Sequence, residues 1–343
     1  MRGIGQAGPR RSVASVWLED KAMVWACRLE DSPSRFPLQV LATFVPQAAV
    51  GFPLQSLTRN ARIRFQGLRL VTSIALFCTF LNATAINPIW TTSDKRMIKQ
   101  LARLDYTNPA EVAEYFSEHR NGNGDKEIED LGFGWKVWHT GIGGGYVGVM
   151  AEFYYFRDSI VAYEVVPRMP TEPELRARYT EWYATAFSFE GDVLQPREYG
   201  MRSLEEPLPQ YKGVFSTKPS VDSIRTYLSP ACGTRYGFRG GYSNTLTANR
   251  ACFRNIKDKV DDDMLLLMMY SINPATRLTA IEYYYYRTGH EFGANPEVDA
   301  WVRKVFSEVP RVSFAIGCIG ETMDAEAAVA LFGSFTEEWY GEK

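Results

Sequence analysis

The stretch that decides the fold is residues 146–166, which read YVGVMAEFYYFRDSIVAYEVV. Apolar side chains recur at every second position from Val147 to Tyr155, and this period of two is typical of a strand with one buried face. Arg157 and Asp158 then form a two-residue turn ahead of a second apolar run. The pattern predicts two antiparallel strands, over residues 146–156 and 159–166.

Working outward from this hairpin, a further strand is expected at residues 133–138 and a helix on each side of the strands. The first helix, over residues 108–118, has Pro109 at the first helical position, where a missing N–H costs nothing. Pro173 opens the second helix, whose apolar stripe includes Leu175 and Tyr179. Residues 86–192 therefore predict an α-β-β-β-α unit.

The remainder of the chain shows a pattern that repeats that order. A helix is expected around Ile224 and Tyr227, strands at residues 234–240, 264–272 and 277–286, and a final helix opened by Pro296. We therefore predict an α+β fold made by tandem duplication, with antiparallel sheets packed by helices. Its halves are residues 86–192 and 220–343, joined by a proline-containing connector at 193–219. The alternative is one mixed sheet whose strands happen to alternate with helices.

A secretory leader is predicted at residues 62–85, RIRFQGLRLVTSIALFCTFLNATA. Arginines flank a short apolar run, and Ala83 and Ala85 supply the small residues that signal peptidase requires. Residues 1–61 are then a disordered segment or an extension ahead of the true start. We expect a periplasmic or secreted protein that starts at Ile86 and is not an integral membrane protein. A buried helix is the alternative for the apolar run.

The charge balance disfavours a nucleic-acid partner. The chain holds 38 basic and 40 acidic residues, and residues 1–85 contain 10 of the basic and 4 of the acidic ones. The rest therefore carries 28 basic against 36 acidic residues. An acidic surface repels phosphate backbones and favours a cationic partner.

Cysteines and glycine-rich motifs give no sign of a cofactor or a metal. In an oxidising compartment Cys232 and Cys252 are candidates for a disulfide, and Cys318 is expected to be a buried thiol. The GGGYVG string at residues 143–148 precedes a strand instead of a helix, so we interpret it as a loop and not as a dinucleotide site. We expect neither a cofactor nor a metal ion.

An enzyme would have to use acidic residues or histidines. The candidates are Glu152, Glu164, Glu282, His139 and His290. The first three lie in predicted strands, and Glu164 and Glu282 occupy matching places in the two predicted halves. Paired carboxylates in a cleft suit general acid and base chemistry on a glycan, and a histidine could act as a base on an ester. The alternative is that each glutamate faces solvent from its strand.

Aromatic side chains are the candidates for recognition. The strings FYYF at 153–156 and YYYY at 283–286 suggest an exposed sheet surface with Tyr154, Phe156, Tyr284 and Tyr286 as contact residues. We predict an exported, non-catalytic binding protein of a bacterial-type cell envelope, whose partner is another envelope or secreted protein. An envelope hydrolase and a carrier of an apolar small molecule are the alternatives.

Overall fold

The computed structural model describes residues 86–119, 128–211, 222–240, 245–289, 291–316 and 319–333. The predicted leader, the segment ahead of it, His290 and Cys318 lie outside the described residues. The described chain combines helices with antiparallel sheets, which confirms the predicted α+β class.

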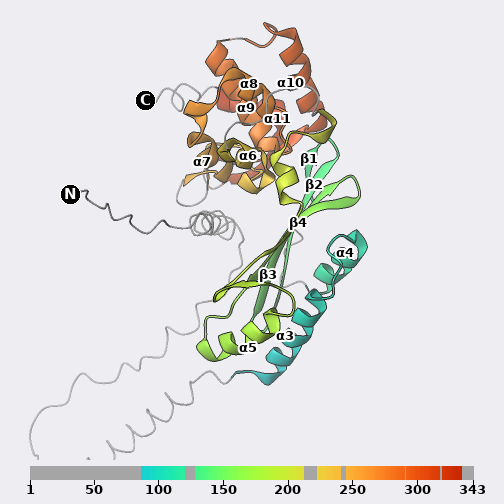
Figure 1. Ribbon diagram of the computed structural model, residues 1–343. Helices are drawn as coiled ribbons and strands as arrows, with labels where there is room; N and C mark the ends of the chain where they lie inside the picture. The colour runs from blue at the N-terminus through green and yellow to red at the C-terminus, as the bar shows by residue number, and fades with distance from the viewer. Residues whose placement is uncertain are drawn as a thin grey trace, which may run out of the picture.

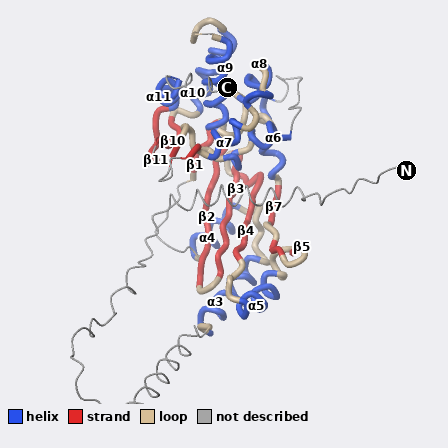
Figure 2. Tube along the Cα trace, turned by 90° about the vertical axis from the view of Figure 1, so that its left-hand side faces the viewer, coloured by secondary structure: helices blue, strands red, loops and turns tan. Residues whose placement is uncertain are grey.

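A five-stranded antiparallel sheet forms the centre of the molecule (Figure 2). Its strands, in spatial order, are β1 (Glu129–Gly132), β2 (Trp135–Gly144), β3 (Val147–Phe156), β4 (Ser159–Arg168) and β7 (Arg197–Tyr199). The predicted hairpin is confirmed, because Phe156 pairs with Ser159 across Arg157 and Asp158. β2 and β3 pair in continuous register from Trp135 opposite Phe156 to Gly144 opposite Val147.

One face of this sheet is covered by three helices (Figure 1). They are α3 (Pro88–Leu101), α4 (Pro109–Glu118) and α5 (Pro173–Tyr183). α3 and α4 begin in the same way, since Asn87 and Asn108 each accept a backbone N–H bond as N-cap and a proline follows. Alternate sheet residues such as Val149 and Phe153 pack beneath these helices.

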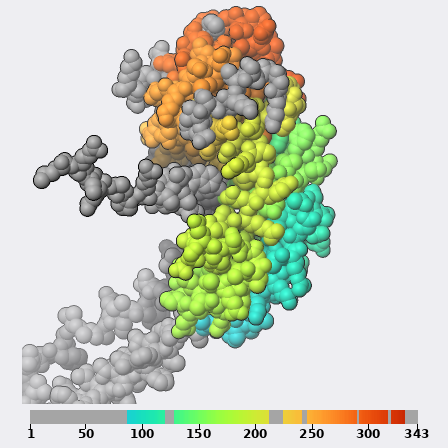
Figure 3. Space-filling model, in the orientation of Figure 1, coloured from blue at the N-terminus to red at the C-terminus, as the bar shows by residue number. Residues whose placement is uncertain are grey.

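The other face of the sheet contacts the helical second half of the chain only near one end. Trp135, Val137, Tyr154 and Ala162 share a core with that half. Figure 3 shows the two halves stacked, with the segment that includes β7 between them. β2, β3 and β4 thus run from the helical half toward α3 and α5, as Figure 1 also shows.

The second half is built mainly from helices. They are α6 (Asp222–Leu228), α7 (Ala248–Arg254), α8 (Asp262–Met268), α9 (Pro274–Thr288), α10 (Pro296–Glu308) and α11 (Ala325–Gly333). A hairpin of β10 (Arg311–Ile316) and β11 (Ile319–Asp324) precedes α11, so the helix opened by Pro296 is not the last element.

The strands predicted at residues 264–272 and 277–286 are wrong, because residues 264–268 belong to α8 and residues 277–286 belong to α9. Both helices lie in the core, and α9 is buried without interruption from Pro274 to Glu282. A helix buried on all sides shows the same continuous apolar run as a central strand. Residues 234–240 contain only the two-residue strand β8 (Arg239–Gly240), paired with β9 (Thr245–Leu246). The structure therefore does not confirm the tandem duplication.

The connector predicted at residues 193–219 contributes to the sheet. β7 pairs with β4, and the short strand β6 (Val193–Leu194) pairs with β5 (Phe189–Glu190). A 3₁₀ turn, η1 (Met201–Glu205), follows β7. None of the helices in the described ranges is both long and apolar enough to cross a membrane.

The turn between β1 and β2 inserts Phe133 into the helical half. Gly132, Phe133 and Gly134 all have positive φ, and Phe133 has φ +57°. The Phe133 ring stacks on Trp301 with ring centroids 5.5 Å apart. It also lies 4.9 Å from the guanidinium of Arg277, which is fully buried and donates to the Leu131 carbonyl. Burial lowers the pKa of Arg277 to about 9. This turn fixes the sheet to the helical half.

Candidate functional site

Four polar side chains form a row across the sheet. The pairing register sets His139 of β2 opposite Glu152 of β3, Glu152 opposite Glu164 of β4, and Glu164 opposite Glu198 of β7. Residues directly opposite each other in antiparallel strands point to the same face. We call His139, Glu152, Glu164 and Glu198 the acidic row.

Glu152 lies at the centre of a hydrogen-bonded group. It is 1% exposed, and its Oε2 accepts a hydrogen bond from the Tyr154 hydroxyl at 2.7 Å. Its Oε1 lies 3.2 Å from Nδ1 of His139. A carboxylate on one ring nitrogen fixes the orientation of an imidazole.

His139 also connects the row to β1 and to the second half of the chain. Its Nε2 lies 3.9 Å from Oε2 of Glu129, which in turn accepts a hydrogen bond from the Thr234 hydroxyl at 2.8 Å. The side chains of His139 and Glu129 are 21% and 26% exposed. Solvent therefore reaches the row at this end.

Glu152 and Glu164 are both buried, and Glu164 is only 2% exposed. The alternative that each glutamate faces solvent from its strand is therefore wrong for these two residues. Two carboxylates directly opposite each other repel, which costs stability in a sheet. The sequence located both residues in strands, but it could not show that the register brings them together. The two glutamates and His139 thus form one group, as the enzyme hypothesis requires.

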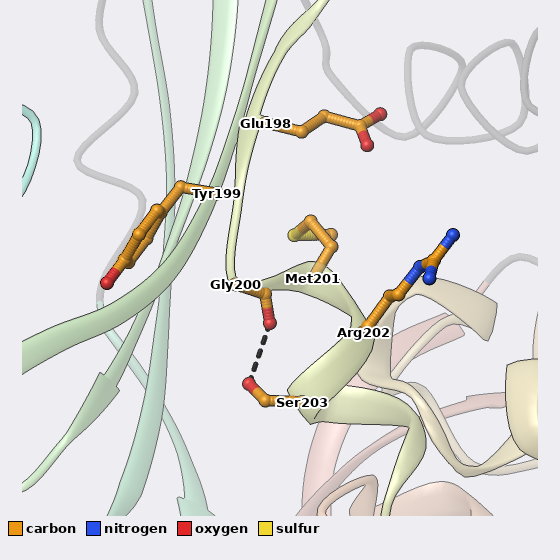
Figure 4. A pocket seen from close by; sticks show the side chains of 6 residues that line it. All are labelled: Glu198, Tyr199, Gly200, Met201, Arg202 and Ser203. Atoms are coloured by element: carbon orange, nitrogen blue, oxygen red, sulfur yellow. Dashed lines mark hydrogen bonds between the residues drawn. The ribbon is translucent and has the colours of Figure 1, made fainter.

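The far end of the row opens into a shallow depression of about 330 Å³ (Figure 4). It is lined by residues 198–203, and Glu198 itself is exposed. Figure 4 shows Glu198 and Arg202 on the same side of the chain, with Tyr199 on the opposite side. Gly200 has φ +66°, and a Cβ there would lie 2.2 Å from the Val161 carbonyl oxygen. The sequence pattern predicted these residues only as part of a connector.

Glu282 belongs to a different group in the second half. It lies on α9, and its Oε2 is 2.9 Å from Nη2 of Arg250 and accepts a hydrogen bond from the Tyr236 hydroxyl at 2.6 Å. Both partners of this ion pair are buried. Glu282 therefore neutralises a buried cation, and it is not the counterpart of Glu164 that the predicted duplication implied.

The aromatic residues predicted as an exposed recognition surface do not form one. Tyr154 is fully buried and Tyr284 is 5% exposed, so neither ring is available at the surface. Phe156 is partly buried, and Tyr286 is exposed. The four consecutive tyrosines belong to helix α9, which distributes them around its axis instead of over two faces of a strand.

The predicted disulfide partners are both thiols. Cys232 is buried and its Sγ donates to the Thr226 carbonyl at 3.1 Å, while Cys252 is partly buried. The two residues are not bonded to each other. Within the described part of the chain, no three His, Cys, Asp or Glu side chains gather closely enough to hold a metal ion.

Asp94 is a buried carboxyl group that the sequence did not reveal. It lies on α3, accepts a hydrogen bond from the Tyr146 backbone N–H at 2.8 Å, and accepts another from the Tyr179 hydroxyl. Burial raises the pKa of Asp94 above its ordinary value. Its contacts join α3, α5 and the β2–β3 turn, so its role is to hold these elements together.

Comparison of the chain with protein families, with characterised proteins and with solved structures found no match.

Proposed function

We propose that this chain is an exported binding protein that holds a cationic segment of another envelope or secreted protein at the acidic row. The observation that carries the proposal is the continuous register from His139 through Glu152 and Glu164 to Glu198. Export rests on the leader pattern of residues 62–85.

The division between buried and accessible groups supports binding over catalysis. Glu152 and Glu164 are buried, so neither can touch a ligand directly. Glu198 at one end of the row, and Glu129 beyond His139 at the other end, are accessible to a partner. Accessible carboxylates produce a negative surface potential, which attracts a cation.

The test is the binding of a fluorescent ten-residue oligolysine to the full chain, followed by anisotropy at low salt. Glu129→Gln and Glu198→Gln should each weaken binding about two- to fivefold, since an exposed ion pair contributes about 0.2–1 kcal/mol. Glu321→Gln, an exposed change on β11, is the matched control and should have no effect. Equal weakening by all three variants would mean that the peptide senses only net charge, and the proposal would fail.

A second candidate, an envelope hydrolase, is favoured by the contact between Glu152 and His139 Nδ1 at 3.2 Å. A carboxylate that orients an imidazole leaves Nε2 available to take a proton from an attacking water. Hydrolysis of 4-nitrophenyl acetate by the full chain, lost in His139→Gln, would support this function. A rate equal to that of the buffer would exclude it for esters of this class.

A further inference from the structure

Among the described residues, no strand pairs with the outer side of β2 beyond its first three residues, beside the acidic row. β1 pairs with β2 only through Trp135, Lys136 and Val137. From Trp138 to Gly144 no strand in the described ranges pairs with the outer side of β2. Seven residues of strand span about 23 Å, which is enough to receive a peptide of similar length.

Within the described residues, this edge lacks proline, lysine and a bulge, three of the features that prevent strand addition. Residues 138–144 read WHTGIGG and include no proline and no lysine. The pairing between β2 and β3 is regular over the whole length, so no bulge turns the edge away. His139, Thr140 and Gly141 are partly exposed, so the backbone at the middle of the edge is accessible.

Acidic side chains lie on β1 and on helix α4, beside this edge. Glu129 lies at the near end of the edge. Helix α4 packs on β2 through Phe116 and Trp138, whose ring centroids are 6.2 Å apart. That helix carries exposed Glu111, Glu114 and Glu118 and no basic residue. Two copies of this chain paired edge to edge would bring their own acidic groups together, which disfavours a second copy as the occupant.

We infer that an extended cationic segment of the partner adds to the edge of β2 as a further strand over residues 138–144. This rests on the proposed function and names its mode of binding. Backbone hydrogen bonds from β2 provide affinity, and lysine or arginine side chains of the added strand lie near Glu129 and His139. The partner segment is therefore basic and able to form a strand.

The test measures amide hydrogen exchange of the full chain with the blocked peptide KVKVKVKV. Alternate amides among residues 138–144 should exchange at least tenfold more slowly with the peptide than without it, because only every second N–H points outward. The peptide EVEVEVEV and a KVKVKVKV peptide with N-methylated alternate amides should give no protection. Thr140→Lys should abolish protection by placing a cation at the edge, whereas Thr140→Gln should retain it.

Each outcome decides between the two proposals. Oligolysine binding that depends on Glu129 and Glu198, without protection of residues 138–144 by KVKVKVKV, would overturn strand addition and leave the proposed function standing. Loss of both results would overturn both. Protection of this edge that appears at high protein concentration without peptide would identify a second copy as the occupant and would overturn the inference. Thermal unfolding of both Thr140 variants establishes that they fold.

Discussion

Phe133 provides the sharpest test of how the sheet is joined to the helical half. The ring is 8% exposed and contacts Trp301 and Arg277. Truncation of a buried phenylalanine to alanine costs about 3–5 kcal/mol. Loss of the ring also removes the cation–π contact with a buried guanidinium, which contributes about 2 kcal/mol when desolvated. The two losses together predict that Phe133→Ala lowers the free energy of unfolding by about 5–7 kcal/mol.

The left-handed backbone at Phe133 supplies a matched comparison. At an ordinary position glycine is less stable than alanine by about 0.5–1 kcal/mol. At φ +57° an alanine retains a strain of about 1–2 kcal/mol that glycine does not have. Phe133→Gly should therefore be at least as stable as Phe133→Ala, and Phe133→Leu should lie closest to the wild type.

Urea unfolding of the three variants, followed by tryptophan fluorescence, measures these differences. A loss below about 1 kcal/mol for Phe133→Ala would show that the ring does not hold the halves together. A glycine variant clearly less stable than the alanine variant would refute the left-handed turn.

Three further predictions concern other parts of the chain. Because burial raises the pKa of Asp94 above 3.8, the stability it contributes is complete below that pH and is lost as the pH rises through the raised pKa. Asp94→Asn should remove this part of the pH dependence of urea unfolding, and identical profiles would contradict it. After alkylation of the unreduced, denatured full chain, peptide mass spectrometry should find both Cys232 and Cys252 alkylated, whereas protection of both would indicate a disulfide between them. Gly200→Ala should lower the free energy of unfolding by about 1–3 kcal/mol more than Gly289→Ala, because both positions have positive φ but only Gly200 faces a backbone oxygen. Equal losses would contradict the close approach at Gly200.

The sequence was most informative where one face of an element is buried and the other is not. The alternation from Val147 to Tyr155 predicted β3, and the Asn108–Pro109 pair marks the start of α4. The pattern-based prediction failed for α9, because the first residues of this helix are buried on all sides and show no helical period. A usable signal was present, since Asn273 followed by Pro274 is the same start as Asn108 followed by Pro109.

The candidate site could be predicted only in part. Glu152 and Glu164 were identified as acidic residues within strands, but their alignment with His139 depends on register, which a single sequence does not give. Glu198 was missed because the proline-rich connector shows no strand pattern around the three residues of β7. The prediction that Glu164 and Glu282 occupy equivalent positions in two halves failed because it relied on the duplication.

The most direct test of the acidic row is the salt dependence of oligolysine binding to the full chain. We predict that log Kd rises with log salt for the wild type, and that the slope is smaller in the Glu129→Gln/Glu198→Gln double variant than in Glu321→Gln. An equal slope in both variants would contradict the claim that these two ends of the row bind the cation.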